Sequence, residues 1–337
     1  MKSQLFLIQI LRGVAASLVV IHHTLAELFT SYSLYNINIG FGRSGVDLFF
    51  VISGFVILYS YKKNKTKPVV FLIKRFFRVA PLYYFFTILA IIIFVSFNDY
   101  EETISHLIKS LLFIPSENSK GIIAPIYGLG WTLNYEFYFY LIFAVGLLFK
   151  RNISLIVYLI LISILIFSNI FFIHFYSNLI CTEFIFGMIC CELYMKGYIV
   201  KKPFLLFLFG LILFLIPLFL EFNLNYRFFY HGIPSAIILY SLVCFEYKKK
   251  FNNKNKIFNM LLKIGVSSYS LYLVHPFLIQ AVFLIFPIEI LEYNIFTTIL
   301  VITISCILLG VITFNLIESN LTIVTKKLLN TIKYVKP

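Results

Sequence analysis

The sequence predicts an all-α membrane protein with about ten transmembrane helices and with both termini in the cytoplasm. Three observations predict this class. Of the 337 residues, 61% are hydrophobic and only 12% are charged, whereas soluble domains carry about a quarter charged residues. Apolar stretches long enough to cross a ~30 Å hydrocarbon core recur along the chain. The basic residues fall in the gaps between these stretches rather than in one patch.

The predicted spans follow one another with mostly short connections. They lie near residues 5–29, 44–61, 79–97, 131–149, 153–173, 178–195, 203–221, 230–247, 267–287 and 295–318. With the N-terminus in the cytoplasm, the outer loops hold only Arg43, Lys109, Lys120 and Arg227. The other loop lysines and arginines gather on the inner side, as the positive-inside rule requires. We expect one membrane domain over residues 1–320 and a short basic cytoplasmic tail over residues 321–337.

The charge and cysteine content exclude several kinds of partner. A net charge of +14 would favour nucleic acid in a soluble protein, but here the charges lie at the ends of spans. The expected partner is therefore the lipid bilayer, with no nucleic acid. The five cysteines lie in apolar runs, which predicts neither a disulfide nor a metal site. His106 and His231 lie in loops or at span edges and are expected to be solvated.

Two ionisable side chains, which are energetically unfavourable inside a membrane, lie in the first predicted span. Arg12 and His23 are separated by ten residues, which places them roughly 16 Å apart along a helix and within about 20° of the same face. Ionisable side chains at membrane depth are expensive and face a protein interior or a polar cavity. This face of the helix is therefore predicted to border a protected polar space. His22 points about 100° away from His23, so we expect it to support or pack.

Further polar side chains are predicted near the outer side of the membrane. Asp47 lies near the outer end of the second span, where its carboxylate can reach His22 or His23 and fix the ring tautomer. Glu136 lies near the outer end of the fourth span. The neighbouring Trp131 has two open roles, as an interfacial anchor or as a stacking surface for a substrate.

The inner side of the membrane carries a second group of candidates. Arg75 and Arg78 lie just before the predicted helix of Pro81 and are three residues apart, so they share one helical face. Guanidinium groups match phosphate oxygens, but the spacing alone favours topology and contact with anionic lipid. His275 is expected nearer the inner half of the ninth span, whereas His22 and His23 are expected in the outer half of the first span. Glu246, close to a span end, is expected to snorkel to water.

Six ordered sequence blocks resemble the membrane acyltransferase-3 family, which includes O-acetyltransferases of bacterial surface polysaccharides. The blocks are the R-x10-H spacing of Arg12 and His23, GRSGVDLFFVISGFVI (42–57), KRFFRVAPLYY (74–84), WTLNYEFYFYL (131–141), EFIFGM (183–188) and SYSLYLVHPF (268–277). Together they run across most of the chain. The chain resembles the stand-alone members, which lack an additional extracytoplasmic esterase-like domain.

The resemblance implies transfer of acetyl, or a longer acyl group, from a coenzyme A thioester to a hydroxyl of a cell-surface or lipid-linked glycan. It also implies a place in the bacterial cytoplasmic membrane, with acetyl-CoA as a substrate and no permanently bound cofactor or metal. His23 would act as general base or first accept the acyl group, Asp47 would orient it, and Glu136 would act on the acceptor side. Donor binding would fall to Arg12, Arg75 and Arg78. Acceptor-binding or supporting roles would fall to His22, Trp131 and His275.

A function from another class remains open. Intramembrane His, Arg and Asp residues also build relays in transporters, so a transporter of a lipid-linked sugar or of protons would fit without acyl-transfer chemistry. No inverted repeat is evident in the sequence, which weighs mildly against this alternative. Within the enzyme class, the acceptor could instead be a lipid-linked sugar precursor, peptidoglycan or a small macrolide-like molecule.

Overall fold

The fold was analysed in a computed structural model, which describes residues 5–32, 42–97, 101–149, 152–167, 174–219, 226–249 and 255–331. Over these residues the regular structure is helical, apart from one isolated bridge between Glu117 and Ile123. The predicted all-α class is thus confirmed. The chain forms two compact units, residues 1–60 with 182–314 and residues 61–181 with 315–337.

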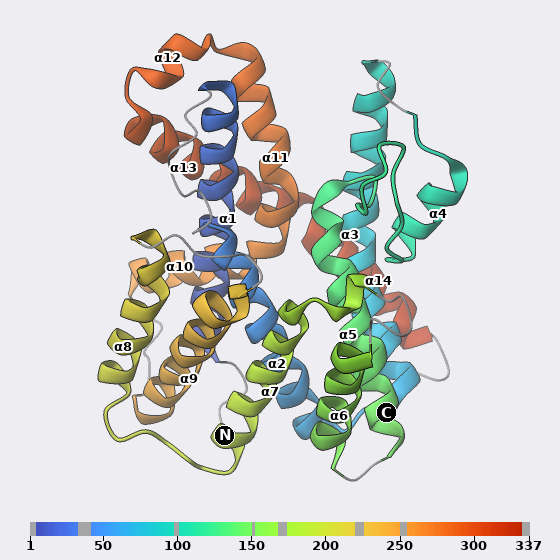
Figure 1. Cartoon of the computed structure of the whole chain (residues 1–337), viewed down its shortest axis with the longest axis vertical. Coiled ribbons are helices and arrows are strands. Elements are labelled where there is room, and N and C mark those ends of the chain that lie inside the picture. Colours follow the sequence, from blue (N-terminus) through green and yellow to red (C-terminus); the bar gives the residue numbers. More distant parts are fainter. Residues whose placement is uncertain are drawn as a thin grey trace. The chain divides into compact units, whose positions relative to one another are not determined.

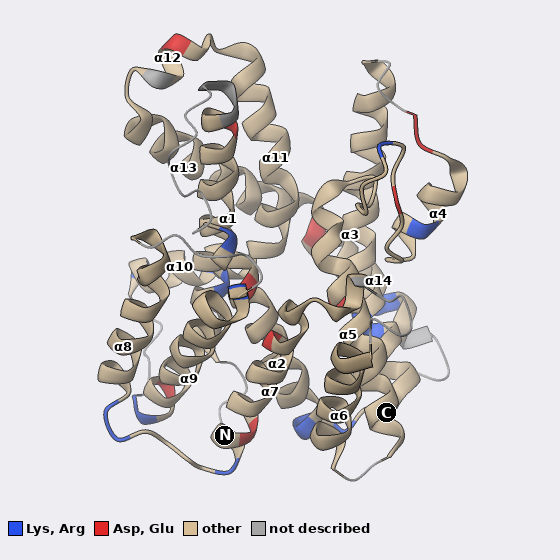
Figure 2. Ribbon diagram, in the orientation of Figure 1, with Lys and Arg blue, Asp and Glu red and all other residues tan. Residues whose placement is uncertain are grey.

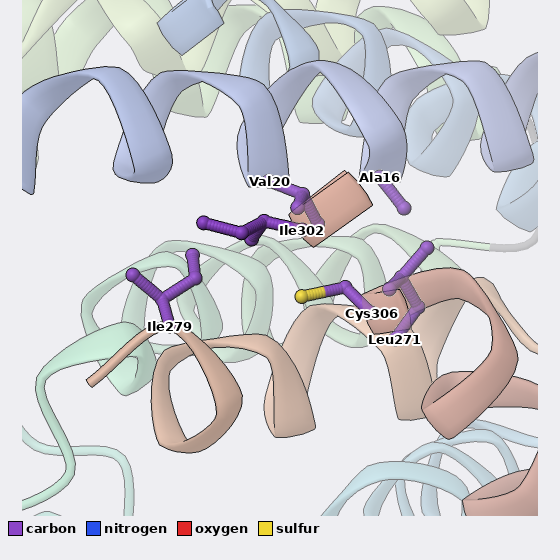
Figure 3. Packing of buried hydrophobic residues seen from close by; sticks show 6 residues of the cluster. All are labelled: Ala16, Val20, Leu271, Ile279, Ile302 and Cys306. Atoms are coloured by element: carbon purple, nitrogen blue, oxygen red, sulfur yellow. The ribbon is translucent and has the colours of Figure 1, made fainter. Parts of the chain in front are cut away.

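The first unit is built around α1, α11 and α13, which lie along one another (Figure 1). Small side chains of α1, Ala16 and Val20, pack there against Leu271 of α11 and Cys306 of α13 (Figure 3). The helices of this unit are α1 (Phe6–Tyr32), α2 (Ser44–Asn64, whose last turn belongs to the second unit), α7 (Thr182–Met195), α8 (Pro203–Leu215), α9 (Ile233–Lys248), α10 (Lys256–Val266), α11 (Ser268–Ile285), α12 (Ile288–Glu292) and α13 (Ile295–Thr313).

The carboxylate of a residue in α9 caps the N-terminus of α1. The backbone N–H groups of Phe6 and Leu7 each donate a hydrogen bond of 2.9 Å to Glu246, whose side chain is buried. The first N–H groups of a helix have no intrahelical partner and carry partial positive charge, so an anion stabilises them. The prediction that Glu246 snorkels to water is therefore wrong.

Two glycines allow α2 and α7 to cross at backbone contact. A Cβ atom at Gly54 would lie 2.1 Å from the carbonyl oxygen of Phe184, and one at Gly187 would lie 1.9 Å from that of Val51. Small residues let membrane helices approach this closely. The crossing holds the first turns of both helices, which carry the acidic residues of the site, near each other.

The second unit contains α3 (Pro68–Ser96), α4 (Ile104–Leu111), α5 (Trp131–Leu148), α6 (Ile153–Phe167) and α14 (Ser319–Thr331). Proline suits the first turn of a helix because its missing N–H would have no partner there, and α3 accordingly begins at Pro68. The segment with Arg75 and Arg78 therefore lies inside this helix, not before it as predicted. Leu329 of α14 packs against Val70 of α3, and the domain boundary at residue 320 stays a prediction.

Several helices are long and apolar enough to cross a membrane, which supports the predicted multi-pass class. Among the described residues there are six, namely Phe6–Phe29, Ser44–Asn64, Pro68–Ser96, Phe228–Lys248, Ser268–Ile285 and Ile295–Leu329. Two further apolar helices, Ile153–Phe167 and Pro203–Leu218, are shorter, and α7 has only 14 residues. The count of ten and the orientation of the termini stay predictions.

Candidate functional site

The candidate site of the first unit centres on two histidine rings, one from α1 and one from α11. Nε2 of His275 lies 3.0 Å from Nδ1 of His23. Nδ1 of His23 also lies 3.1 Å from the carbonyl oxygen of Val19, and Nδ1 of His275 lies 3.2 Å from that of Leu271. His275 is fully buried, whereas His23 is half-buried.

These contacts assign the tautomer of each neutral ring. A ring nitrogen that faces a carbonyl oxygen must donate its hydrogen, because the carbonyl only accepts. Both rings therefore carry their hydrogen on Nδ1, and Nε2 of His275 accepts from the Nδ1–H of His23. Nε2 of His23 is then the unprotonated, basic nitrogen of the pair, which is the state that a general base needs.

A close contact between two glycines brings the two rings to the same level. A Cβ atom at Gly265 in α10 would lie 1.9 Å from the carbonyl oxygen of Gln9. A Cβ atom at Gly13 would lie 3.0 Å from the backbone nitrogen of Gly265. His23 follows Gly13 by ten residues, and His275 follows Gly265 by ten residues. The prediction that His275 lies at a different level from His23 is therefore wrong, because α11 begins part-way along α1.

Replacing Gly265 with alanine is expected to lower the free energy of unfolding by about 1–3 kcal/mol, because the added methyl group overlaps the backbone of α1. The matched control is Gly128→Ala, since a Cβ atom there meets nothing within 4 Å. Thermal unfolding of the purified protein compares the two variants. Equal unfolding temperatures would contradict the contact.

His22 lies beside His23 but makes a different contact. The two ring centroids are 5.2 Å apart, and Nε of Arg43 donates to Nε2 of His22 over 3.3 Å. Gly42 allows this approach, because a Cβ atom there would lie 2.3 Å from Cβ of His22. Partial desolvation and the like charge of Arg227 lower the pKa of Arg43, although a guanidinium remains protonated at neutral pH. His22 thus joins the start of α2 to α1.

Asp47 in the first turn of α2 pairs with an arginine rather than with a histidine. Nη2 of Arg227 lies 2.7 Å from Oδ2 of Asp47, and Nε lies 2.9 Å from Oδ1. The same Nη2 donates to the carbonyl oxygen of Arg43 over 2.8 Å. Asp47 is completely buried, and the fork of the guanidinium matches both carboxylate oxygens. The predicted hydrogen bond between Asp47 and a histidine of α1 is therefore wrong.

A second carboxylate joins this ion pair. Glu183 in the first turn of α7 is completely buried and interacts electrostatically with Asp47 and Arg227. Its two oxygens accept no hydrogen bond from any residue that the structure describes. His231 is also buried and lies within electrostatic range of Asp47. His106 of the second unit is buried as well, so the predicted solvation is wrong for both histidines. Two buried carboxylates and one guanidinium carry a net charge of −1, which one proton on either carboxylate or on His231 neutralises.

The second unit holds a separate cluster around Arg75. Its guanidinium carbon lies 5.5 Å from the ring centroid of Phe71 and 5.6 Å from that of Tyr140, which is a cation–π arrangement. The hydroxyl of Tyr140 donates to Glu136, and Glu136 interacts electrostatically with Arg75. Arg78 follows one turn later and is exposed.

The packing of Gly130 explains why Arg75 and Glu136 meet. A Cβ atom at Gly130 would lie 2.5 Å from the hydroxyl oxygen of Tyr83, so α5 begins beside the middle of α3. Glu136 of α5 then lies at the same height along α3 as Arg75. The prediction that these two residues lie on opposite sides of the membrane is wrong for this unit.

The two remaining predicted site residues are Arg12 and Trp131. Arg12 is half-buried on α1, three turns before His23. Trp131 is half-buried at the start of α5, with its ring centroid 6.0 Å from that of Tyr135 in an edge-on arrangement. The donor role of Arg12 and both roles of Trp131 stay predictions.

Comparison with known proteins identifies the family. Residues 7–315 match the family model of the acyltransferase domain of the acyltransferase-3 type. The chain belongs to the acyltransferase-3 family. This confirms the family resemblance that the ordered sequence blocks predict.

One relative of this acyltransferase-3 protein is the exopolysaccharide production protein ExoZ of Rhizobium meliloti (strain 1021). The two are 39% identical over 114 residues, which is 33% of this chain and 36% of the relative. The chain thus matches about a third of the length of that relative. No solved structure matches this acyltransferase-3 chain.

Sequence reasoning missed three members of the polar network in this acyltransferase-3 protein. Arg227 was counted as a loop charge, His231 as a solvated histidine, and Glu183 only as part of a family block. The available signal was the spacing of Arg227 and His231, which lie four residues apart beside a predicted span on the side that is poor in basic residues. Residues with this spacing share one face of a helix.

Proposed function

We propose that this protein is a membrane O-acyltransferase that moves acetyl from acetyl-CoA to a hydroxyl of a cell-surface or lipid-linked glycan. The observation that carries the proposal is the basic Nε2 of His23, in a chain that belongs to an acyltransferase family. The name of the ExoZ relative, an exopolysaccharide production protein, supports an exopolysaccharide as acceptor. The distribution of basic residues supports a place in the bacterial cytoplasmic membrane with both termini in the cytoplasm.

The chemistry can follow one of two routes. In direct transfer, Nε2 of His23 takes the proton of the acceptor hydroxyl while its oxygen attacks the thioester carbonyl. The carbon–sulfur bond then breaks, and the protonated ring returns the proton to the departing sulfur. In covalent transfer, Nε2 attacks the thioester carbonyl, the carbon–sulfur bond breaks and coenzyme A leaves as a thiolate. The acceptor oxygen then attacks the acetyl carbon, the bond from that carbon to Nε2 breaks, and the hydroxyl proton passes to water. In the direct route the Nδ1–H bond from His23 to His275 strengthens as His23 becomes charged, which supports His275 as a positioning residue.

The remaining residues receive the roles that the family resemblance implies. Asp47 acts as a positioning residue through Arg227, whose guanidinium holds the segment that begins α2. Glu136 and Trp131 are assigned to the acceptor, and Arg12 to the donor. None of these assignments requires a metal or a permanently bound cofactor.

The proposal is tested with purified protein in liposomes, acetyl-labelled coenzyme A and a glycan fraction isolated from the producing cells. We expect labelled ester on the glycan, released by mild base. Absence of label on every glycan fraction, with folded protein, would overturn the proposal. Initial rates at several donor and acceptor concentrations separate the routes, because covalent transfer gives ping-pong kinetics.

Replacing Arg75 and Arg78 together with alanine is expected to raise the KM for acetyl-CoA at least about tenfold, because each lost charge-assisted hydrogen bond to a phosphate contributes more than 1 kcal/mol. The control is Lys74→Ala, an exposed cation on the same turn. Steady-state kinetics with varied donor measure the effect. An unchanged donor KM returns both arginines to a topological role.

A transporter remains the second candidate, favoured by the number of buried ionisable groups in the first unit. His23, His275, Asp47, Glu183 and His231 lie in or beside one network, and such groups form proton relays in pumps. Proton uptake by liposomes that contain the protein but no acetyl-CoA would favour this candidate over transfer chemistry.

A further inference from the structure

A shallow cavity of about 430 Å³ lies in the first unit between the start of α8 and the end of α9. Lys202, Lys248 and Lys249 line it, and no acidic residue is among the described residues of its lining. Figure 2 shows Lys and Arg at the connection that leads into α8 and at the end of α9. The cavity shares no residue with the histidine network or with the Arg75 cluster.

Two of the three ammonium groups are held in place. Nζ of Lys248 donates to the carbonyl oxygen of Lys201 over 2.6 Å, and Nζ of Lys249 lies 5.9 Å from the ring centroid of Phe245. The nearest acidic neighbour in sequence, Glu246, is occupied with the N-terminus of α1. Among the residues that the structure describes, the lining of the cavity therefore presents positive charge and no carboxylate.

The wall of the cavity is apolar and continues along α8. Pro203, Phe204, Leu205 and Phe245 form the wall. From Leu205 a stripe runs up the helix through Phe209 and Ile212, whose side chains are 55%, 53% and 62% exposed. Residues with these spacings share one helical face, and α8 is one of the apolar helices of a membrane protein.

We propose that the cavity binds the headgroup of an anionic phospholipid, with the phosphate among the three lysines and an acyl chain along the stripe on α8. A free phosphate or another small soluble anion would use the lysines but would gain nothing from the apolar wall and stripe. A neutral lipid would use the stripe and leave the lysines unpaired. The combination of both features fits a lipid that carries negative charge. The proposal does not depend on acyl transfer.

The lipid proposal is tested by native mass spectrometry. The protein is released from nanodiscs that contain phosphatidylcholine and phosphatidylglycerol. We expect wild-type protein to retain phosphatidylglycerol. The variant Lys202→Gln, Lys248→Gln, Lys249→Gln should lose it, with about a fivefold drop in occupancy ratio for each lysine removed. The control variant Lys196→Gln, Lys256→Gln, Lys263→Gln removes three exposed lysines that do not line the cavity and should retain the lipid.

Four results would overturn the proposal. Equal loss of phosphatidylglycerol in both triple variants would reduce the effect to overall charge. Displacement of the lipid by millimolar inorganic phosphate would indicate a site for a soluble anion, and displacement by coenzyme A would assign the cavity to the acyl donor. A variant Leu205→Gln, Phe209→Gln that keeps the three lysines should weaken retention, and unchanged retention would exclude the acyl chain from α8.

Discussion

Replacing His23 with alanine is expected to lower kcat for acetyl transfer by about 10²–10⁴-fold, because the variant has no group to remove the proton of the acceptor hydroxyl. The binding of acetyl-CoA should change little, since the residues proposed to bind it are Arg12, Arg75 and Arg78. The measurement is transfer of labelled acetyl by purified protein in liposomes, at saturating donor. Protein that remains folded and inserted, yet transfers at the wild-type rate, would remove His23 from the chemistry.

His275→Ala is a second variant, for which we expect a smaller loss of kcat than for His23→Ala. It leaves Nε2 of His23 in place and removes the ring that accepts the Nδ1–H bond, over 3.0 Å in the native protein. A single hydrogen bond contributes about 1 kcal/mol, so we expect kcat to fall about fivefold. The donor KM should stay unchanged. A loss as large as that of His23→Ala would instead make His275 a catalytic residue.

Replacing Arg227 with methionine is expected to lower the free energy of unfolding by about 3–5 kcal/mol, because Asp47 is left buried and charged without its partner. Asp47→Leu should cost less, since the arginine side chain is 17% exposed and can turn its charge to solvent. The double variant Arg227→Met, Asp47→Leu should regain much of the loss, because an apolar pair replaces the ion pair.

Unfolding is measured with a thiol-reactive dye, because all five cysteines are buried in the folded protein and none of them forms a disulfide. The control is Arg43→Met, an exposed arginine for which we expect a change within about 1 kcal/mol. If the double variant is as unstable as Arg227→Met, the instability does not come from an unpaired Asp47. Stability, not activity, is the readout, since Asp47 is a proposed positioning residue.

The predictable part of the site lies within single helices. Arg12 and His23 could be placed on one face of α1 because an uninterrupted helix has fixed rise and rotation. The helical class and the multi-pass character follow from composition and from the alternation of apolar runs with basic loops. The six ordered blocks were sufficient to predict the acyltransferase-3 family.

The level at which neighbouring helices meet could not be predicted in this way. Hydropathy places the end of a helix within several residues, and one turn already shifts a side chain by about 5.4 Å, more than the length of a hydrogen bond. The partner of Asp47 illustrates this limit, because Arg227 is distant in sequence and had the appearance of an ordinary loop charge.

The sequence by itself determined the helical membrane class, the family and the polar face that carries Arg12 and His23. Only the tertiary structure decided that His275 meets His23, that Arg227 holds Asp47, and that Arg75 lies near Glu136. The physical reason is that close contacts at three glycines set the registers of the helices, at Gly13 and Gly265 with backbone and at Gly130 with the side chain of Tyr83. These contacts form between segments that are far apart in the chain, and no local pattern encodes them.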